Sequence, residues 1–155
     1  MPDETLAALA KKLRLTAETR LLALDAPDEY LASLHQSGVV ASLATAAQAG
    51  ATYDAVHLFA RDQAQARQAL PSAAAALRAG GVLWVMWPKQ SARVATNLTR
   101  DSLAALALTL GWGPVSNVSI DATWSALRLR PEADVKRTGS SWPPAAQESS
   151  QESSR

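Results

Sequence analysis

Apolar residues in this chain gather in short blocks, and the blocks alternate with segments in which apolar residues recur at helical spacing. Three blocks are apolar at almost every position, which predicts strands buried on both faces. Three weaker blocks are also typical of strands, and the last two flank a short polar turn, which indicates a hairpin. The six predicted strands lie at residues 20–25, 39–43, 54–60, 82–87, 115–120 and 124–130.

The amphipathic segments between these blocks predict helices. The first helix begins at Asp3, and its leucines fall on one face. A second helix begins at Pro27, a residue suited to the first helical turn, and runs to about residue 35. The last begins at Thr99, whose hydroxyl can cap it, and stops at Gly111.

Three further helical segments are predicted from composition and from helix breakers. An alanine-rich stretch that closes at Gly50 is expected to be helical. A helix capped by Asp62 is expected to reach about residue 69, where Pro71 breaks it and starts another helix. That helix is expected to end at Gly80-Gly81, a common stop signal.

The alternation of strands and helices predicts the fold class. We expect an α/β, Rossmann-like domain at residues 1–131, with a mainly parallel sheet, helices on both faces and a C-terminal antiparallel hairpin at one edge. Trp84 and Trp87 lie three residues apart on one strand, so their side chains should point to opposite faces. Residues 132–155 are expected to be a disordered polar tail, in which Trp142 is a candidate docking anchor.

Composition removes several classes of function. The chain has 155 residues and a net charge of +1, and the tail holds four acids and three bases, so the domain carries +2. This balance predicts no nucleic-acid partner and no membrane partner. Without cysteine, disulfides, thiolate metal sites and cysteine nucleophiles are excluded. The acidic start differs from a signal peptide, and a cytoplasmic location is expected by exclusion.

The predicted layout resembles that of class I methyltransferases. The resemblance implies a glycine-rich turn after the first strand and an acid at the end of the second strand, which together hold the cofactor. In this chain the turn is Leu24-Asp-Ala-Pro-Asp28, which lacks glycine and in which Pro27 removes a backbone N–H. No acid occurs between Leu31 and Tyr53. We therefore expect no cofactor, and neither S-adenosylmethionine nor NAD in the usual mode.

Three short runs resemble the pattern LWVxWPK…ATxLT…DxTWSxL of an uncharacterised bacterial family. They are GGVLWVMWPK at 80–89, VATNLT at 94–99 and DATWSAL at 121–127. The resemblance covers roughly residues 5–130 and implies one domain of this fold, but no activity. Asn97 stands where the pattern usually has an acid.

Ligands of open parallel sheets bind outside the carboxyl ends of the strands. The residues expected at this edge are Asp25, Asp28, Arg61, Trp87, Lys89, Ser91, Arg93, Thr96, Asn97 and Trp124. Lys89 and Arg93, with the helix start at Thr99, could hold an anion, and Trp87 and Trp124 could wall a pocket. The alternatives are that the two cations lie in a solvated loop and that Asp25 caps the next helix.

The two histidines do not indicate catalysis. His57 lies in an apolar strand, where a hydrogen-bonded core residue is expected, and His35 closes a helix, where a cation suits the helix dipole. Two separated histidines make a poor metal site. The GxSxG elbow of a serine nucleophile and the GxxxxGK[ST] phosphate loop are both missing from the sequence.

The sequence predicts no reaction. The favoured hypothesis is a non-catalytic regulatory or protein-interaction module on a degenerate methyltransferase-like scaffold. The alternative is a small enzyme, or a protein that binds an anionic metabolite, which uses the loop after the fourth strand. A nucleic-acid-binding role has only the +2 charge of the domain behind it.

Overall fold

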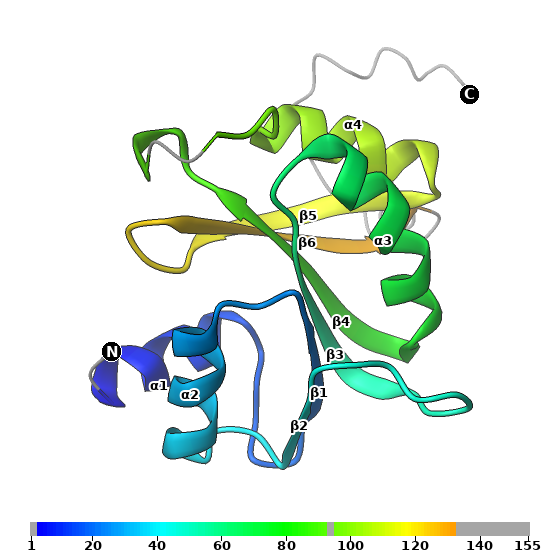
Figure 1. The fold of residues 1–155 in the computed structure, drawn as a ribbon. Helices are drawn as coiled ribbons and strands as arrows, with labels where there is room; N and C mark the ends of the chain where they lie inside the picture. The colour runs from blue at the N-terminus through cyan, green and yellow to red at the C-terminus, as the bar shows by residue number, and fades with distance from the viewer. Residues whose placement is uncertain (1–2, 93–94, 133–155) are drawn as a thin grey trace.

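One six-stranded sheet forms the centre of the molecule (Figure 1), in the order β2-β1-β3-β4-β6-β5. The structure is a computed structural model that describes residues 3–92 and 95–132; the predicted tail, Trp142 and Arg93 lie outside them. The strands are β1 (Arg20–Leu24), β2 (Ser42–Ala44), β3 (Tyr53–Phe59), β4 (Leu77–Pro88), β5 (Trp112–Ser119) and β6 (Trp124–Pro131). The predicted mainly parallel α/β sheet is confirmed, because β1 to β4 pair in parallel.

The predicted C-terminal hairpin is also confirmed, with one refinement. β6 lies between β4 and β5 and is antiparallel to both. The edge of the sheet is therefore formed by β5, and β6 is one strand in from it. The turn is closed by Asp121, whose Oδ1 accepts the N–H groups of Thr123 and Trp124, each at 2.8 Å. This is the side-chain turn for which aspartate is favoured.

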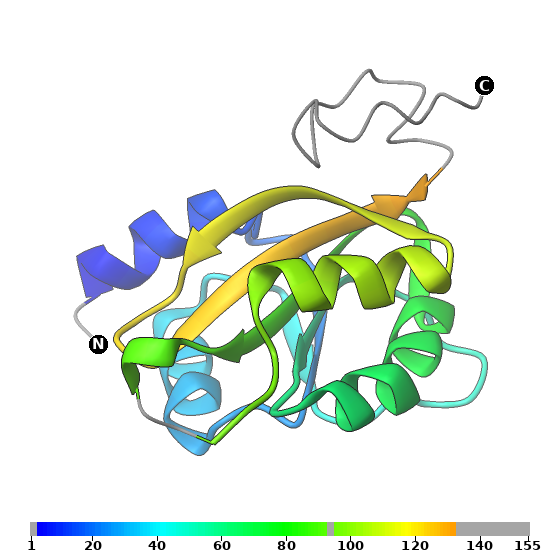
Figure 2. The same cartoon turned by 90° about the horizontal axis from the view of Figure 1, so that it is seen from above.

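Helices cover both faces of the sheet, as predicted (Figures 1 and 2). The helices are α1 (Asp3–Lys12), α2 (Asp28–Ser37), α3 (Gln63–Ala75) and α4 (Arg100–Thr109), with a short 3-10 helix, η1 (Gln90–Ala92). α1 and α2 pack on one face and α3 and α4 on the other. Thr99 caps α4 through a reciprocal capping box with Ser102, which confirms the predicted start.

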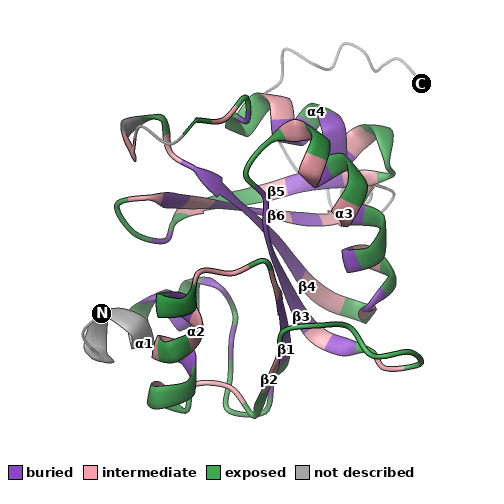
Figure 3. Ribbon diagram, viewed as in Figure 1, coloured by how far each residue is buried: buried purple, intermediate pink, exposed green. Residues whose placement is uncertain are grey.

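Two separate apolar cores result, one on each face, and the buried residues run along the central strands (Figure 3). Trp84 belongs to the core under α1 and α2, and Trp87 to the core under α3 and α4. The prediction that these two indoles point to opposite faces is therefore confirmed. Both are buried, at 1% and 5% exposure.

The prediction that Pro71 ends one helix and starts another is wrong. Pro71 lies inside α3, which continues to Ala75. Proline costs this helix one backbone hydrogen bond, but Leu70 and Ala73 on either side of it are buried in the core and hold the helix on the sheet. Pro71 itself is exposed, so its ring faces away from that packing.

Gly80 and Gly81 do not end a helix either; they lie within β4. The pairing of β3 with β4 shifts register between Tyr53 and Ala55, so the β4 backbone bulges over this stretch. Gly80 has a φ of 79°, and a Cβ on Gly81 would lie 2.9 Å from the carbonyl oxygen of Asp54. Gly80 therefore serves the left-handed backbone of the bulge, and Gly81 serves a close backbone approach inside a strand.

The alanine-rich stretch before Gly50 is not helical; it forms bends and turns after β2. It is too short to nucleate a helix by itself, and alanine offers little apolar area to anchor it. The strand predicted at 39–43 is observed later, at Ser42–Ala44.

Candidate functional site

The order of strands reverses between β1 and β3, since the chain continues from β1 to β2 on one side and from β3 to β4 on the other. In open α/β sheets the crevice at such a reversal, outside the carboxyl ends of the strands, is the usual ligand site. Asp25 follows β1 and Arg61 lies just beyond β3. The structure therefore places these two predicted residues at the reversal point.

Asp25 takes the backbone conformation for which glycine is usually needed, with a φ of 58°. Its carbonyl oxygen accepts a hydrogen bond from Nη1 of Arg61 (3.1 Å), and its carboxylate accepts one from Nε2 of Gln65 (3.1 Å). The alternative that Asp25 caps the next helix is wrong, because Pro27 holds the N-cap position of α2 and no side chain caps it. Asp25 instead ties the end of β1 to the segment after β3.

Gln65 completes this connection, and the sequence analysis missed it. Its Oε1 accepts the backbone N–H of Arg61 (2.8 Å), and its Nε2 also donates to the carbonyl oxygen of Phe59 (3.2 Å). Gln65 is held in place because its own N–H donates to the capping carboxylate of Asp62 (2.8 Å). The signal was present as an acid followed three residues later by glutamine at a helix start.

Arg61 also reaches the hairpin. Its guanidinium lies 5.3 Å from the ring centroid of Trp124, within the range of a cation–π contact. Trp124 is buried against Phe59, with the two rings edge to face at 5.0 Å. We call Asp25, Arg61, Gln65 and Trp124 the crevice latch, since they join the carboxyl ends of β1 and β3 and the start of β6 across the reversal point.

A buried pair lies behind the latch, under α2. The hydroxyl of Tyr30 is 2.8 Å from Nδ1 of His57, and His57 is fully buried. Burial lowers the pKa of His57 to about 3, so the ring is neutral at neutral pH. Burial, and after it the charge of Asp121, raises the pKa of Tyr30. The prediction of a hydrogen-bonded core histidine is confirmed.

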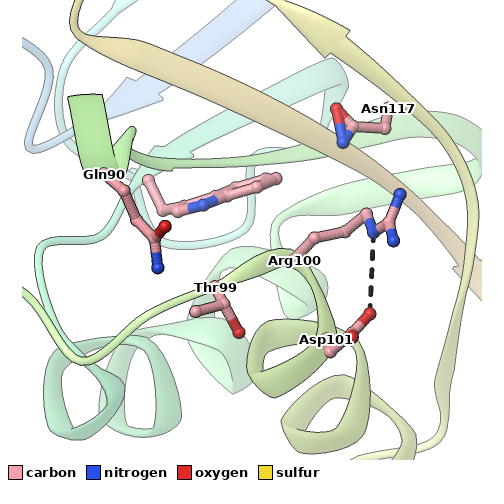
Figure 4. A pocket seen from close by; sticks show the side chains of 6 residues that line it. Gln90, Thr99, Arg100, Asp101 and Asn117 are labelled. Atoms are coloured by element: carbon pink, nitrogen blue, oxygen red, sulfur yellow. Dashed lines mark ion pairs between the residues drawn. The ribbon is translucent and has the colours of Figure 1, made fainter. Parts of the chain in front are cut away.

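A separate open cavity of about 340 Å³ lies where β4 ends and α4 begins (Figure 4). Among the predicted site residues whose side chains the structure describes, only Trp87 lines it. The Arg100 side chain extends toward Asn117 and pairs with Asp101, with Nε and Oδ1 3.6 Å apart. Gln90 belongs to the loop and Thr99 to the helix start that were expected at this edge, whereas Arg100, Asp101 and Asn117 were not predicted.

The loop after β4 is tied to its surroundings. Nζ of Lys89 donates to the hydroxyl of Ser119 in the hairpin (2.6 Å). Oδ1 of Asn97 accepts a hydrogen bond from the backbone N–H of Gln63 (2.7 Å), and the carbonyl oxygen of Asn97 accepts one from Nε2 of Gln63 (2.8 Å). These two bonds join the loop to the start of α3. Oγ1 of Thr96 accepts the N–H of Leu98 (3.0 Å).

Among the remaining predicted site residues, Asp28 joins neither the cavity nor the latch. Asp28 is exposed in the first turn of α2, where a carboxylate suits the helix dipole. Arg93 falls outside the described residues, and so does the side chain of Ser91. The predicted anion site formed by Lys89 and Arg93 stays a prediction. Of these two residues the structure describes Lys89, whose side chain is hydrogen-bonded to Ser119 of the hairpin.

Within residues 3–92 and 95–132, no cluster of three or more histidines and acids is placed to hold a metal ion. No helix of the described chain has the length and apolar character needed to cross a membrane.

No protein-family model matches the chain, and no curated protein sequence matches it. Solved structures do match. The CcbJ methyltransferase from Streptomyces caelestis aligns with a TM-score of 0.53 at 14% identity, over 84% of this chain and 90% of that chain. Magnesium protoporphyrin IX methyltransferase (ChlM) from Synechocystis PCC 6803, with bound SAH, aligns with a TM-score of 0.53 at 11% identity, over 82% of this chain and 80% of that chain.

A protein of the NADB-Rossmann superfamily from Streptococcus agalactiae gives a TM-score of 0.54 at 11% identity, over 84% of this chain and 69% of that chain. Identities this low show the fold alone. The chain therefore has a Rossmann-like, methyltransferase-like fold, as the sequence analysis predicted.

Proposed function

We propose that this domain is a non-catalytic regulatory or protein-interaction module built on a methyltransferase-like scaffold. The observation that carries the proposal is the crevice latch. A cofactor bound in the usual mode would need the carboxyl ends of β1 and β3. At this place the Arg61 guanidinium donates to the carbonyl oxygen of Asp25. The Gln65 side-chain amide makes three more hydrogen bonds, to the carboxylate of Asp25, the carbonyl oxygen of Phe59 and the backbone N–H of Arg61.

The chemistry of the turn supports the same proposal. A phosphate or carboxylate of a cofactor is held by free backbone N–H groups at a helix start. Here Pro27 has no N–H to offer, and Asp25 brings a carboxylate whose charge would repel an anionic group. The turn thus lacks donors where a cofactor would need them and carries a charge of the wrong sign.

Calorimetric titration of the purified chain with S-adenosylmethionine, S-adenosylhomocysteine and NAD tests this proposal. We expect no saturable heat with any of the three. A matched variant, Arg61→Ala with Gln65→Ala, removes the latch side chains and shows whether they alone keep ligands out. One-site binding of any cofactor to the wild-type chain, tighter than about 100 μM (about 5.5 kcal/mol of binding free energy), would reject the proposal.

A second candidate function is binding of a small anionic metabolite in the cavity beside α4. It is supported by the size of that cavity, about 340 Å³, which lies at the lower end of small-molecule sites. Thermal-shift screening against organic acids tests it, with Arg100→Gln as the variant that should abolish any shift and Arg67→Gln as the control. A shift that survives Arg100→Gln would place the ligand elsewhere.

Two finer expectations remain parts of this proposal. One is membership of the uncharacterised bacterial family, which is supported by the three runs of sequence at 80–89, 94–99 and 121–127. The other is a cytoplasmic location, which agrees with a chain that contains no cysteine.

A further inference from the structure

Three arginines gather on the sheet face that α1 and α2 cover, away from the cavity. Arg128 and Arg130 are two residues apart on β6, so they share a face with Ala126, which belongs to the core under α1. Trp84 pairs with Arg128 across β4 and β6, and its indole N–H donates to the carbonyl oxygen of Leu13 (3.1 Å). This bond brings Arg14, the next residue, to the same place.

We call Arg14, Arg128 and Arg130 the arginine cluster. Arg128 is its centre and is partly buried, and its Nε is buried without a hydrogen-bond partner among the described residues. Burial, and then the charges of Arg14 and Arg130, lowers the pKa of Arg128. A desolvated guanidinium beside two further cations is unfavourable by itself, and an anion placed between them would offset the repulsion.

The position of Arg14 is fixed by the backbone rather than by a flexible loop. Arg14 follows α1 with a φ of 63°, and its N–H donates to the carbonyl oxygen of Lys11 (3.1 Å). The next residue is tied back as well, because Leu15 donates to the carbonyl oxygen of Ala10 (2.8 Å). Lys11 and Lys12, both exposed in the last turn of α1, add positive charge close by.

We propose that the arginine cluster binds a phosphate group of a small phosphorylated ligand, with Arg128 at the centre of the site. A guanidinium bonds two oxygens of an oxyanion through its fork of N–H groups. A phosphate carries close to two negative charges, which matches several cations better than a single carboxylate does. This site is separate from the cavity beside α4 and independent of the proposed function.

Amide NMR titrations with inorganic phosphate and pyrophosphate, at constant ionic strength, test the site. We expect saturable shifts around residues 14 and 128–130, with pyrophosphate binding more tightly. Arg14→Gln and Arg128→Gln should each weaken binding at least about tenfold, roughly the effect of losing one charge-assisted contact. The matched control is Arg67→Gln, which removes one exposed charge from α3 on the other face.

Three results would overturn the proposal. They are the absence of saturable shifts, an equal loss of binding in Arg67→Gln, and binding of an oligonucleotide without any binding of pyrophosphate. The first would mean that no phosphate site exists, the second that only overall charge matters, and the third that the partner is a nucleic acid.

A thermal measurement keeps the proposal testable if Arg128→Gln folds poorly. In buffer without phosphate, Arg128→Met should melt higher than the wild type, by about 4 °C, because it removes the desolvated charge. Pyrophosphate should then raise the melting temperature of the wild type and leave that of Arg128→Met unchanged. A lower melting temperature of Arg128→Met, with the pyrophosphate effect retained, would show that Arg128 is structural only.

Discussion

The side-chain amide of Gln65 donates to the carboxylate of Asp25 at 3.1 Å, across 40 residues of sequence. This contact joins the turn after β1 to the first turn of α3, at the point where the strand order of the sheet reverses. In a fold where that point usually receives a ligand, the chain supplies its own polar partners.

Substitutions at Asp25 separate the hydrogen bond from the backbone conformation. Asp25→Ala loses the hydrogen bond to Gln65. It also places alanine, which has no polar side chain to stabilise the left-handed conformation, at a φ of 58°. The free energy of unfolding should therefore fall by about 1–2 kcal/mol. Asp25→Asn keeps an acceptor and tolerates the left-handed conformation, so the free energy of unfolding should change by less than about 0.5 kcal/mol. Urea denaturation measures both.

Asp25→Gly completes the series, because glycine accepts the backbone conformation but has no side chain to bond Gln65. Its stability should lie between those of the other two variants. If all three variants are equally stable, the contact with Gln65 contributes nothing measurable, and the latch has no energetic support at this residue.

Gly81→Ala tests the close approach of β4 to β3. The new Cβ would lie 2.7 Å from Cδ1 of Leu77 and 2.9 Å from the carbonyl oxygen of Asp54. Because the carbonyl belongs to the backbone, it cannot move aside without distorting the strand. We therefore expect the free energy of unfolding to fall by about 1–3 kcal/mol. Urea denaturation of Gly81→Ala measures it.

Gly38→Ala is the matched control for this substitution. Nothing lies within 4 Å of a Cβ at Gly38, although its φ is +67°, so only the backbone term of about 1 kcal/mol applies. A Gly81→Ala protein more stable than Gly38→Ala would contradict the tight packing of this bulge.

His57 should make stability fall in acid. The folded-state pKa of His57 is about 3, against 6.5 for the free side chain, so below pH 6.5 the unfolded chain binds a proton that the folded chain does not. Stability from this group is complete above pH 6.5 and is lost as the pH falls toward 3, by up to about 1.4 kcal/mol per pH unit.

The measurement is urea denaturation at pH 7, 6, 5 and 4, for the wild type and for His57→Gln. Carboxylates titrate in both proteins, so the informative quantity is the difference between the two profiles. The wild type should lose stability more steeply than His57→Gln between pH 6 and 4. Parallel profiles would show that His57 does not stay neutral in the folded state.

Most of the fold could be predicted from the sequence because the strongest signals in the sequence are local. Apolar blocks such as Val82–Trp87 within β4, and the cap at Thr99, record their own structure in a few neighbouring residues. The roles of Pro71 and Gly81 could not be predicted in this way because they depend on tertiary contacts. Buried neighbours hold Pro71 in a helix, and a carbonyl of another strand requires Gly81.

The candidate site was less predictable for the same reason. Asp25, Arg61 and Trp124 were expected near one edge of the sheet, since parallel strands place their carboxyl ends together. Gln65 was missed because a glutamine in a helix is usually a solvated residue, and only the folded chain brings it to Asp25. The loop residues Lys89 and Asn97 were expected to face a ligand, but they bond to Ser119 and Gln63.

The most direct test of the central claim is a titration of S-adenosylhomocysteine into the purified chain, followed through the indole N–H signal of Trp124 and the backbone amides of Asp25 and Arg61. Because the crevice latch joins these residues across the point where the strand order reverses, the account predicts no saturable change at any of them up to millimolar ligand. A saturable change at all three, with one binding constant in the micromolar range, would contradict it.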